Sequence, residues 1–102
     1  MPNQPFEQNG ITLTPEDFHY GDMIRITYQG ELTKEGADKI WMFNTFNNEW
    51  KTAQQDEMQK NGQNGFEINL PLKKRGYLQI AFRDSANHWD SNSGNNYSIE
   101  VN

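Results

Sequence analysis

Apolar residues recur at every second position in four segments of the chain, and this alternation is typical of β-strands with one face on a core. The segments are Met23 to Tyr28, Phe66 to Leu70, Tyr77 to Asp84 and Tyr97 to Val101. Their predicted inward residues are Ile24, Ile26, Tyr28, Phe66, Ile68, Leu70, Leu78, Ile80, Phe82, Tyr97, Ile99 and Val101. Turn-forming residues separate the segments, and no long helical period appears. The pattern predicts an all-β fold, an antiparallel β-sandwich of immunoglobulin-like type.

Two other segments carry a weaker strand pattern. Ile11 to Leu13 predicts a short edge strand that stops at Pro15, because proline cannot donate a ladder hydrogen bond. Lys39 to Asn44 is apolar on both faces, which predicts a central strand with Trp41 packed in the core.

The segments between the strands are rich in glycine, asparagine and charged residues. Gly30 to Asp38 predicts a connecting loop, and Asn47 to Glu49 predicts a turn followed by a short partner strand at Trp50 to Ala53. Residues 54–63 read mostly as loop. We therefore expect a lead-in with the edge strand at residues 1–20 and a single β-sandwich domain at residues 21–102.

Composition fits one small domain. The chain has 102 residues, of which only 33% are hydrophobic, but 13% are aromatic. Each aromatic side chain buries about 150–250 Å², so a few of them fill a thin sandwich core. The net charge of -5 argues against a nucleic-acid partner, because binding to phosphate backbones depends on clustered Lys and Arg. The one basic run, Lys73 to Arg75, is predicted to be a solvated turn.

Targeting signals and cysteines do not fix a compartment. No apolar run is long enough for a membrane span, and the N-terminus lacks the basic and apolar segments of a signal peptide. The localisation stays open, because these features fit either an intracellular protein or a module excised from a longer secreted one. The absence of cysteine removes disulfides and thiolate metal sites.

Catalytic signatures are also weak. The only imidazoles are His19 and His88, and neither belongs to a recognisable nucleophile–base pair. Asp84 and Asp90 resemble a glycosidase pair in type but lack an evident cleft. Asp90 to Asn95 is similar to the start of a calcium loop, yet the later acidic ligand is missing, and turn formation explains the same residues. We expect no enzyme activity, no metal and no cofactor.

Two tryptophans lie in polar surroundings. Trp50 follows a polar turn, and Trp89 is the only large apolar residue in the loop after Ala86. An exposed indole offers a flat, electron-rich surface on which the C–H face of a pyranose stacks. The chain also has 13 Asn and 8 Gln, whose amides bind hydroxyl groups at the sugar's edge.

The last third of the chain resembles a known family. Ala81-Phe82-Arg83-Asp84 and the segment Trp89 to Tyr97 are similar to the A-F-x-D and W-D-N-N-G-G-x-N-Y signatures of starch-binding modules, carbohydrate-binding module family 25. The likeness extends from Gly21 to Val101. The resemblance implies a β-sandwich that binds α-glucans such as starch, maltooligosaccharides or glycogen without catalysis, usually as an accessory to an amylase.

The resemblance also implies site residues. The family's two stacking tryptophans fall on Trp50 and Trp89, and its loop Asn and acid fall on Asn92 and Asp90. The family's H-Y-G segment reads Met42-Phe43-Asn44 here, so Met42 stands where the family has a sugar-binding His. A thioether cannot replace the imidazole hydrogen bond, although it can contact an apolar sugar face. The alternative is a protein-interaction module with Trp50 and Trp89 as anchors.

Overall fold

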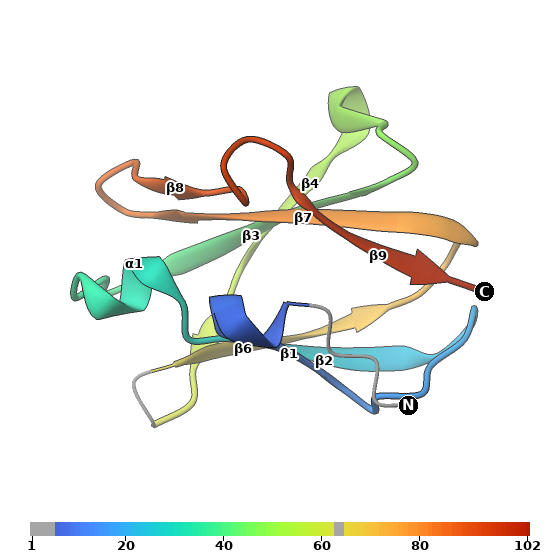
Figure 1. Cartoon of the computed structure of the whole chain (residues 1–102), viewed down its shortest axis with the longest axis horizontal. Coiled ribbons are helices and arrows are strands. Elements are labelled where there is room, and N and C mark those ends of the chain that lie inside the picture. The colour runs from blue at the N-terminus through green and yellow to red at the C-terminus, as the bar shows by residue number, and fades with distance from the viewer. Residues whose placement is uncertain (1–5, 63–64) are drawn as a thin grey trace.

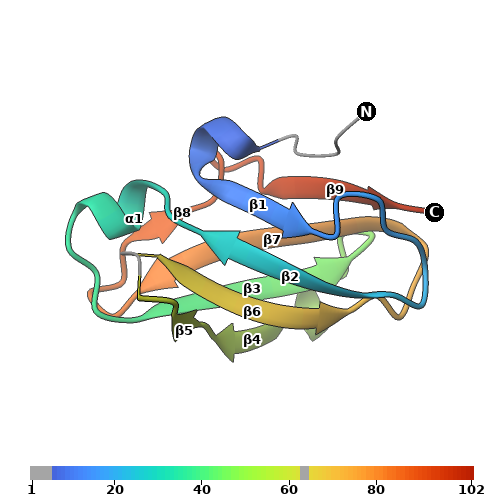
Figure 2. The same ribbon diagram turned by 90° about the horizontal axis from the view of Figure 1, so that it is seen from below.

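Two antiparallel sheets packed face to face form the protein (Figures 1 and 2). The computed structural model describes residues 6–62 and 65–102. Residues 1–5 of the predicted lead-in and residues 63–64 of the predicted loop lie outside the described residues. Sheet A has the order β1-β2-β6-β5, with β1 at Ile11–Thr14, β2 at Met23–Tyr28, β6 at Phe66–Pro71 and β5 at Gln59–Lys60.

Sheet B contains the remaining strands. Its order is β4-β3-β7-β8, with β9 also paired to β7. The bounds are Gln54–Glu57 for β4, Ile40–Phe46 for β3, Gly76–Asp84 for β7, Trp89–Asp90 for β8 and Tyr97–Val101 for β9. This arrangement, with β1-β2-β6-β5 facing β4-β3-β7-β9, corresponds to the two sheets of an immunoglobulin-type sandwich. The predicted fold class is confirmed.

The alternating residues form the core between the sheets. All twelve predicted inward residues are buried except Ile68, which is partly buried and packs against the core. The edge strand expected near Ile11 is present as β1, and Ile11, Leu13 and Phe18 add to the core from before residue 21. β3 lies between β4 and β7, as its apolar faces indicated.

Three predictions about connections were wrong. Trp50–Thr52 is a 3₁₀ helix, η2, and the partner strand of β3 starts only at Gln54. Residues 54–63, expected to be mostly loop, contain both β4 and β5. The loop expected at residues 30–38 contains one helical turn, α1, at Glu31–Lys34. A second 3₁₀ turn, η1, spans Glu7–Asn9.

A buried residue marks the point where the chain passes between the two sheets. The chain crosses from sheet B to sheet A at Met58, which is buried and donates its backbone N–H to the Ile40 carbonyl at 2.8 Å.

In Figure 1, η2 and the connection between β8 and β9 both rise from the side of sheet B that faces away from sheet A. We call that side the outer face of sheet B. Within the described residues, no helix is long and apolar enough to cross a membrane.

Candidate functional site

A row of large side chains crosses the outer face of sheet B. Trp41 on β3 is paired with Arg83 on β7, and Arg83 is paired with Trp89 on β8. Directly opposed residues in antiparallel strands project to the same face. Their sequence neighbours Met42, Phe82 and Asp90 are buried, so the row itself points outward. Together with Phe43, these residues form a surface that we call the aromatic platform: Trp41, Phe43, Arg83 and Trp89.

The indole of Trp89 is the most exposed part of the platform. Its relative exposure is 47%, and its ring centroid lies 4.8 Å from that of Phe43 at an interplanar angle of 49°. Because β8 and β3 are separated by β7, the indole has to extend across β7 to reach Phe43. Ala81 on β7 is the register partner of Phe43, and this outward-facing alanine is only 3% exposed. Its small side chain leaves room for the indole, which packs against Phe43 while about half of its surface stays exposed.

The guanidinium of Arg83 lies over two aromatic rings of the platform. Its guanidinium carbon lies 4.9 Å from the centre of the Trp41 ring and 5.8 Å from that of Phe43. Both distances are within the range of cation–π attraction. No carboxylate within ion-pair distance of Arg83 occurs in residues 6–62 and 65–102. Its N–H donors are therefore available to a ligand lying on the platform.

The loop before β8 is held by Asp84. One carboxylate oxygen accepts hydrogen bonds from the backbone N–H groups of Ala86 and His88, at 3.0 and 2.8 Å. The other lies 3.0 Å from Nδ1 of His88. Burial pushes the pKa of Asp84 upward, but these hydrogen bonds and the nearby imidazole outweigh it, so the pKa is lowered. The ionised carboxylate thus fixes the turn that brings Trp89 back beside Arg83.

Asp90 faces the core, not the platform. One of its carboxylate oxygens accepts a hydrogen bond from the Tyr28 hydroxyl and the other accepts one from the Tyr97 hydroxyl, each at 2.6 Å. Burial and the hydrogen bond to Asp90 raise the pKa of both phenols. Because strand residues alternate between faces, Trp89 pointing outward forces Asp90 inward. Asp90 is 7% exposed and both its oxygens are occupied, so the structure removes it from the sugar-contact set.

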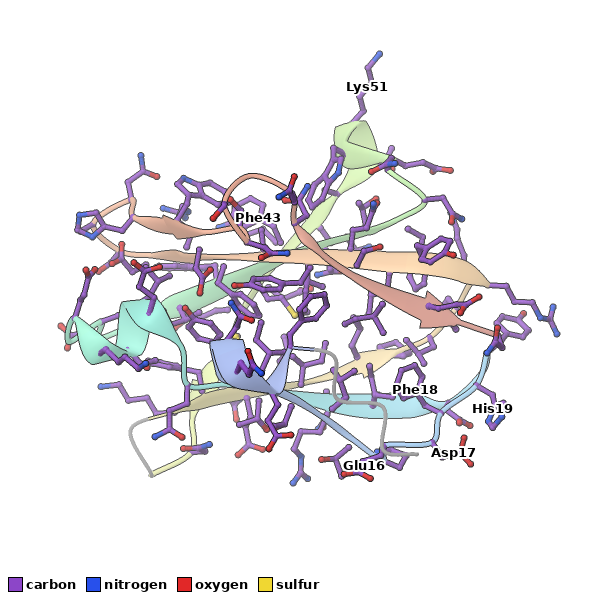
Figure 3. All side chains as sticks on the ribbon, viewed as in Figure 1. Glu16, Asp17, Phe18, His19, Phe43 and Lys51 are labelled. Carbon is purple, nitrogen blue, oxygen red and sulfur yellow. The ribbon has the colours of Figure 1, made fainter. Side chains whose placement is uncertain are left out.

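The expectation that Met42 contacts the sugar is also wrong, because its side chain faces the core. Its exposure is 0%, and it pairs with the buried Phe82, so it cannot touch a ligand on the surface. The neighbouring Phe43, which is labelled in Figure 3, occupies the outward position. Its ring is in contact with that of Trp89. Sequence reasoning missed Phe43, Arg83 and the outward direction of Trp41, because a strand that is apolar on both faces does not reveal which parity points outward.

Trp50 lies on η2 and is half-buried. Asn48 fixes the preceding turn by exchanging two hydrogen bonds with Gln79 of β7: its backbone N–H donates to Oε1 at 2.6 Å and its Oδ1 accepts from Nε2 at 2.7 Å. Figure 3 shows Lys51 of η2 pointing away from the body of the protein, on the same side of sheet B as Phe43. In the part of the chain that the structure describes, no ring contact joins Trp50 to Trp89.

Asn92 belongs to the turn between β8 and β9. It and Ser93 both have left-handed backbone conformations, and Nδ2 of Asn92 donates to the Asn96 carbonyl at 3.2 Å. Asparagine tolerates this conformation better than most residues, which explains its place in the turn. Its Oδ1 makes no hydrogen bond among the described residues, so the side chain keeps one acceptor for a ligand.

In the part of the chain that the structure describes, the ionisable groups are not arranged as a metal site. Among residues 6–62 and 65–102, no group of three His, Asp or Glu side chains is arranged to hold an ion. Asp84 is bound to its own loop and Asp90 to two tyrosines. His19 lies on the connection between β1 and β2, at the far corner of the molecule from Phe43 in Figure 3.

Comparisons with known proteins found no match for the chain. No family model matches it, and neither a curated protein nor a solved structure is significantly similar.

Proposed function

We propose that the protein is a non-catalytic carbohydrate-binding module for α-glucans of the starch and glycogen type. The observation that carries the proposal is the half-exposed indole of Trp89, which is held in a tilted contact with the ring of Phe43. An indole held in this way presents a preformed stacking surface, so binding costs little side-chain entropy. Trp89 opens the second of the two segments that resemble starch-binding modules, Ala81 to Asp84 and Trp89 to Tyr97, and Arg83 of the first segment is its strand partner.

The platform suits a sugar chain because it combines stacking surfaces with hydrogen-bond donors. The C–H face of a pyranose lies on Trp89, and the Arg83 guanidinium is adjacent to donate to its hydroxyl oxygens. Asn92 offers its free amide oxygen to a hydroxyl group from the nearby turn. Because the platform is an open sheet face, it admits units from within a long chain as well as chain ends.

Trp50 is assigned to a second contact further along the same face. It stands on η2, which rises from the outer side of sheet B as the Asn92 turn does (Figure 1). Two separated indoles suit a curved chain such as an α-1,4-glucan better than a single sugar. In this proposal the module acts beside an amylase, as the resemblance implies, and contributes attachment and not bond cleavage.

Titration with maltoheptaose while tryptophan fluorescence is recorded tests the proposal. Stacking on Trp89 changes indole emission, and we expect saturation with a Kd of roughly 1 µM to 1 mM. Cellohexaose, which has the same sugar with β-linkages, is the matched control and should bind at least about tenfold more weakly. Incubation with starch should release no reducing sugar.

Failure to bind any α-glucan would reject the proposal. The exposed Trp89 beside Arg83 would then be better explained as an anchor for a protein partner, because Trp and Arg are enriched at the energetic centres of protein interfaces. Release of reducing sugar from starch would instead contradict the non-catalytic assignment.

A further inference from the structure

A cleft of about 310 Å³ opens on the side of the sandwich, between β4 of sheet B and β6 of sheet A. It exists because β5 is only two residues long and pairs only with Phe66 and Glu67 of β6. The remaining edge of β6, from Ile68 to Pro71, therefore has no strand partner among the described residues. Asn44 and Phe46 line the cleft from the inner side of β3, and no residue of the aromatic platform lines it.

The two walls of the cleft differ in chemistry. The apolar wall contains Phe46, Ile68 and Leu70. The polar wall contains Asn44, Gln54 and Asp56, with Asn44 and Gln54 directly paired across β3 and β4. A pyranose has the matching character, because its C–H faces are apolar and its rim carries hydroxyl groups.

Asn44 provides a buried group that is only half satisfied. The residue is 6% exposed, and every side-chain hydrogen bond it makes uses Nδ2, including one to Asp56 Oδ2 at 3.1 Å. Among the described residues, no group donates a hydrogen bond to its Oδ1. Since no fully buried side-chain oxygen or nitrogen lacks a partner in the described residues, Oδ1 must be reached by solvent. Asn44 lines the cleft, so this acceptor opens into it.

The charges around the cleft restrict the donor that this acceptor receives. Asn44 Oδ1 and the Asp56 carboxylate both require hydrogen-bond donors. Lys73 and Lys74 also line the cleft, and Lys74 Nζ lies 3.8 Å from a Glu49 carboxylate oxygen. Together with the Glu49 and Asp56 carboxylates, these ammonium groups balance the formal charge of the lining, so a neutral ligand suits the cleft. Sugar hydroxyl groups are neutral donors that both acceptors can use.

We propose that this cleft is a second carbohydrate site, which holds a single sugar unit with its hydroxyls on Asn44 and Asp56 and its apolar face against Phe46 and Ile68. Its volume is at the lower end of the range for small-ligand pockets, about 300–1,000 Å³, which fits one unit and not a chain. The site uses none of the platform residues. Sugar binding at the cleft is therefore independent of what the platform binds.

The test uses the full chain with Trp89→Ala, which removes the exposed indole of the platform. Maltose is titrated while backbone amide shifts are followed by NMR. We expect saturable shifts confined to the lining of the cleft, at Phe46, Gln54, Ile68 and Leu70, with a Kd of about 1–10 mM. The same shifts should appear in the unsubstituted protein. No saturable shift at the cleft in either protein overturns the proposal, and that result leaves binding at the platform unaffected.

Two variants separate binding at the cleft from general effects. Asp56→Ala removes the acceptor, whereas the control Glu57→Ala removes the same charge from the outward-facing neighbour on β4. We expect Asp56→Ala to weaken the maltose-induced shifts about tenfold and Glu57→Ala to leave them unchanged. If Asp56→Ala fails to fold, Gln54→Trp fills the cleft from its exposed edge and should abolish the shifts. Equal binding by Gln54→Trp and the unsubstituted protein would also overturn the proposal.

Discussion

The ring of Trp89 lies 4.8 Å from the ring of Phe43, although a whole strand separates the two residues in sheet B. This contact holds a half-exposed indole in one orientation on the sheet. An exposed tryptophan on a free loop would lose conformational entropy on binding, and this one loses little. The contact is therefore what distinguishes the proposed sugar platform from a tryptophan that is merely at the surface.

Replacing Trp89 by alanine tests the centre of the platform. Trp89 is 47% exposed, so its loss should change the thermal midpoint by only a few degrees. Loss of the stacking surface should abolish retention on an amylose affinity gel. Tyr77→Ala is the matched control, because Tyr77 is 51% exposed on the same sheet and, among the described residues, has no ring contact with the platform. A large fall in the midpoint for Trp89→Ala would make Trp89 a structural residue.

Ala81 tests whether the orientation of the indole matters. Leucine at this position would occupy the space across β7 through which Trp89 reaches Phe43. We expect Ala81→Leu to weaken α-glucan binding about tenfold or more, with Trp89 still present and the fold retained. Ala81→Ser adds little volume and should bind normally. Circular dichroism in the near ultraviolet would report the displaced indole, and unchanged binding by Ala81→Leu would show that the contact with Phe43 is not required.

The sequence pattern predicted the strands that bury one face, and it failed where that signal is absent. β4, Gln-Gln-Asp-Glu at residues 54–57, is polar on both faces, because it is a short edge strand beside the open cleft. Nothing in its composition distinguishes it from a loop. The turn residues Asn47 to Glu49 predict a partner strand at Trp50 to Ala53, but the Glu49 carbonyl accepts hydrogen bonds from the Thr52 backbone N–H and hydroxyl, which closes a 3₁₀ turn instead.

Only some positions of the proposed site residues follow from the sequence. The polar surroundings of Trp89 predict its exposure, whereas Met42 and Asp90, expected as sugar contacts, face the core. For Asp90, the deciding fact is a two-residue strand that pairs with β7, and no periodicity can be read from two residues. For Met42, apolar residues at every position from Ile40 to Phe43 hid the alternation. Only the pairing register shows that Phe43 faces outward.

The Asp90 carboxylate and its two tyrosines predict a loss of stability at high pH. The folded-state pKa of Tyr28 and of Tyr97 is raised above the unfolded value of 10.0, so both phenols stay neutral in the fold. Their contribution to the free energy of unfolding is complete below pH 10 and is lost as the pH rises above it, because the unfolded chain then releases protons that the folded chain keeps.

Urea unfolding at pH 8 and at pH 11 measures this loss. In Tyr97→Phe, one of the two phenols is gone, and we expect a shallower decline between the two pH values. The same variant should be less stable at pH 8, by about 1.5–3 kcal/mol, since it removes a buried hydrogen bond to a carboxylate. Tyr20→Phe, at an exposed position, is the control for ordinary alkaline effects. An identical decline in Tyr97→Phe and Tyr20→Phe would contradict the assignment.

Asp84 predicts the opposite dependence at low pH. Burial raises the pKa of Asp84, but the hydrogen bonds from the backbone and imidazole of His88 outweigh it, so the pKa is lowered below its ordinary value of 3.8 in the folded state. A lowered carboxyl pKa stabilises the fold fully above the unfolded value, and that stabilisation is lost as the pH falls through the folded one. The protein should therefore lose stability below about pH 4. Glucan binding should weaken in the same range, because the Asp84 turn positions Trp89.

Asp84→Asn separates this effect from general acid unfolding. The neutral amide cannot accept the hydrogen bonds from Ala86 and His88 as strongly as the charged carboxylate does. We therefore expect a lower free energy of unfolding at pH 7 and a flatter dependence of that free energy on pH between pH 5 and pH 3. Its affinity for maltoheptaose at pH 7 should fall while Trp89 is unchanged, because the turn before β8 loosens. Asp17→Asn, at an exposed carboxylate far from the platform, is the matched control. If Asp84→Asn keeps the steep acid dependence of the unsubstituted protein, other carboxylates are responsible for it.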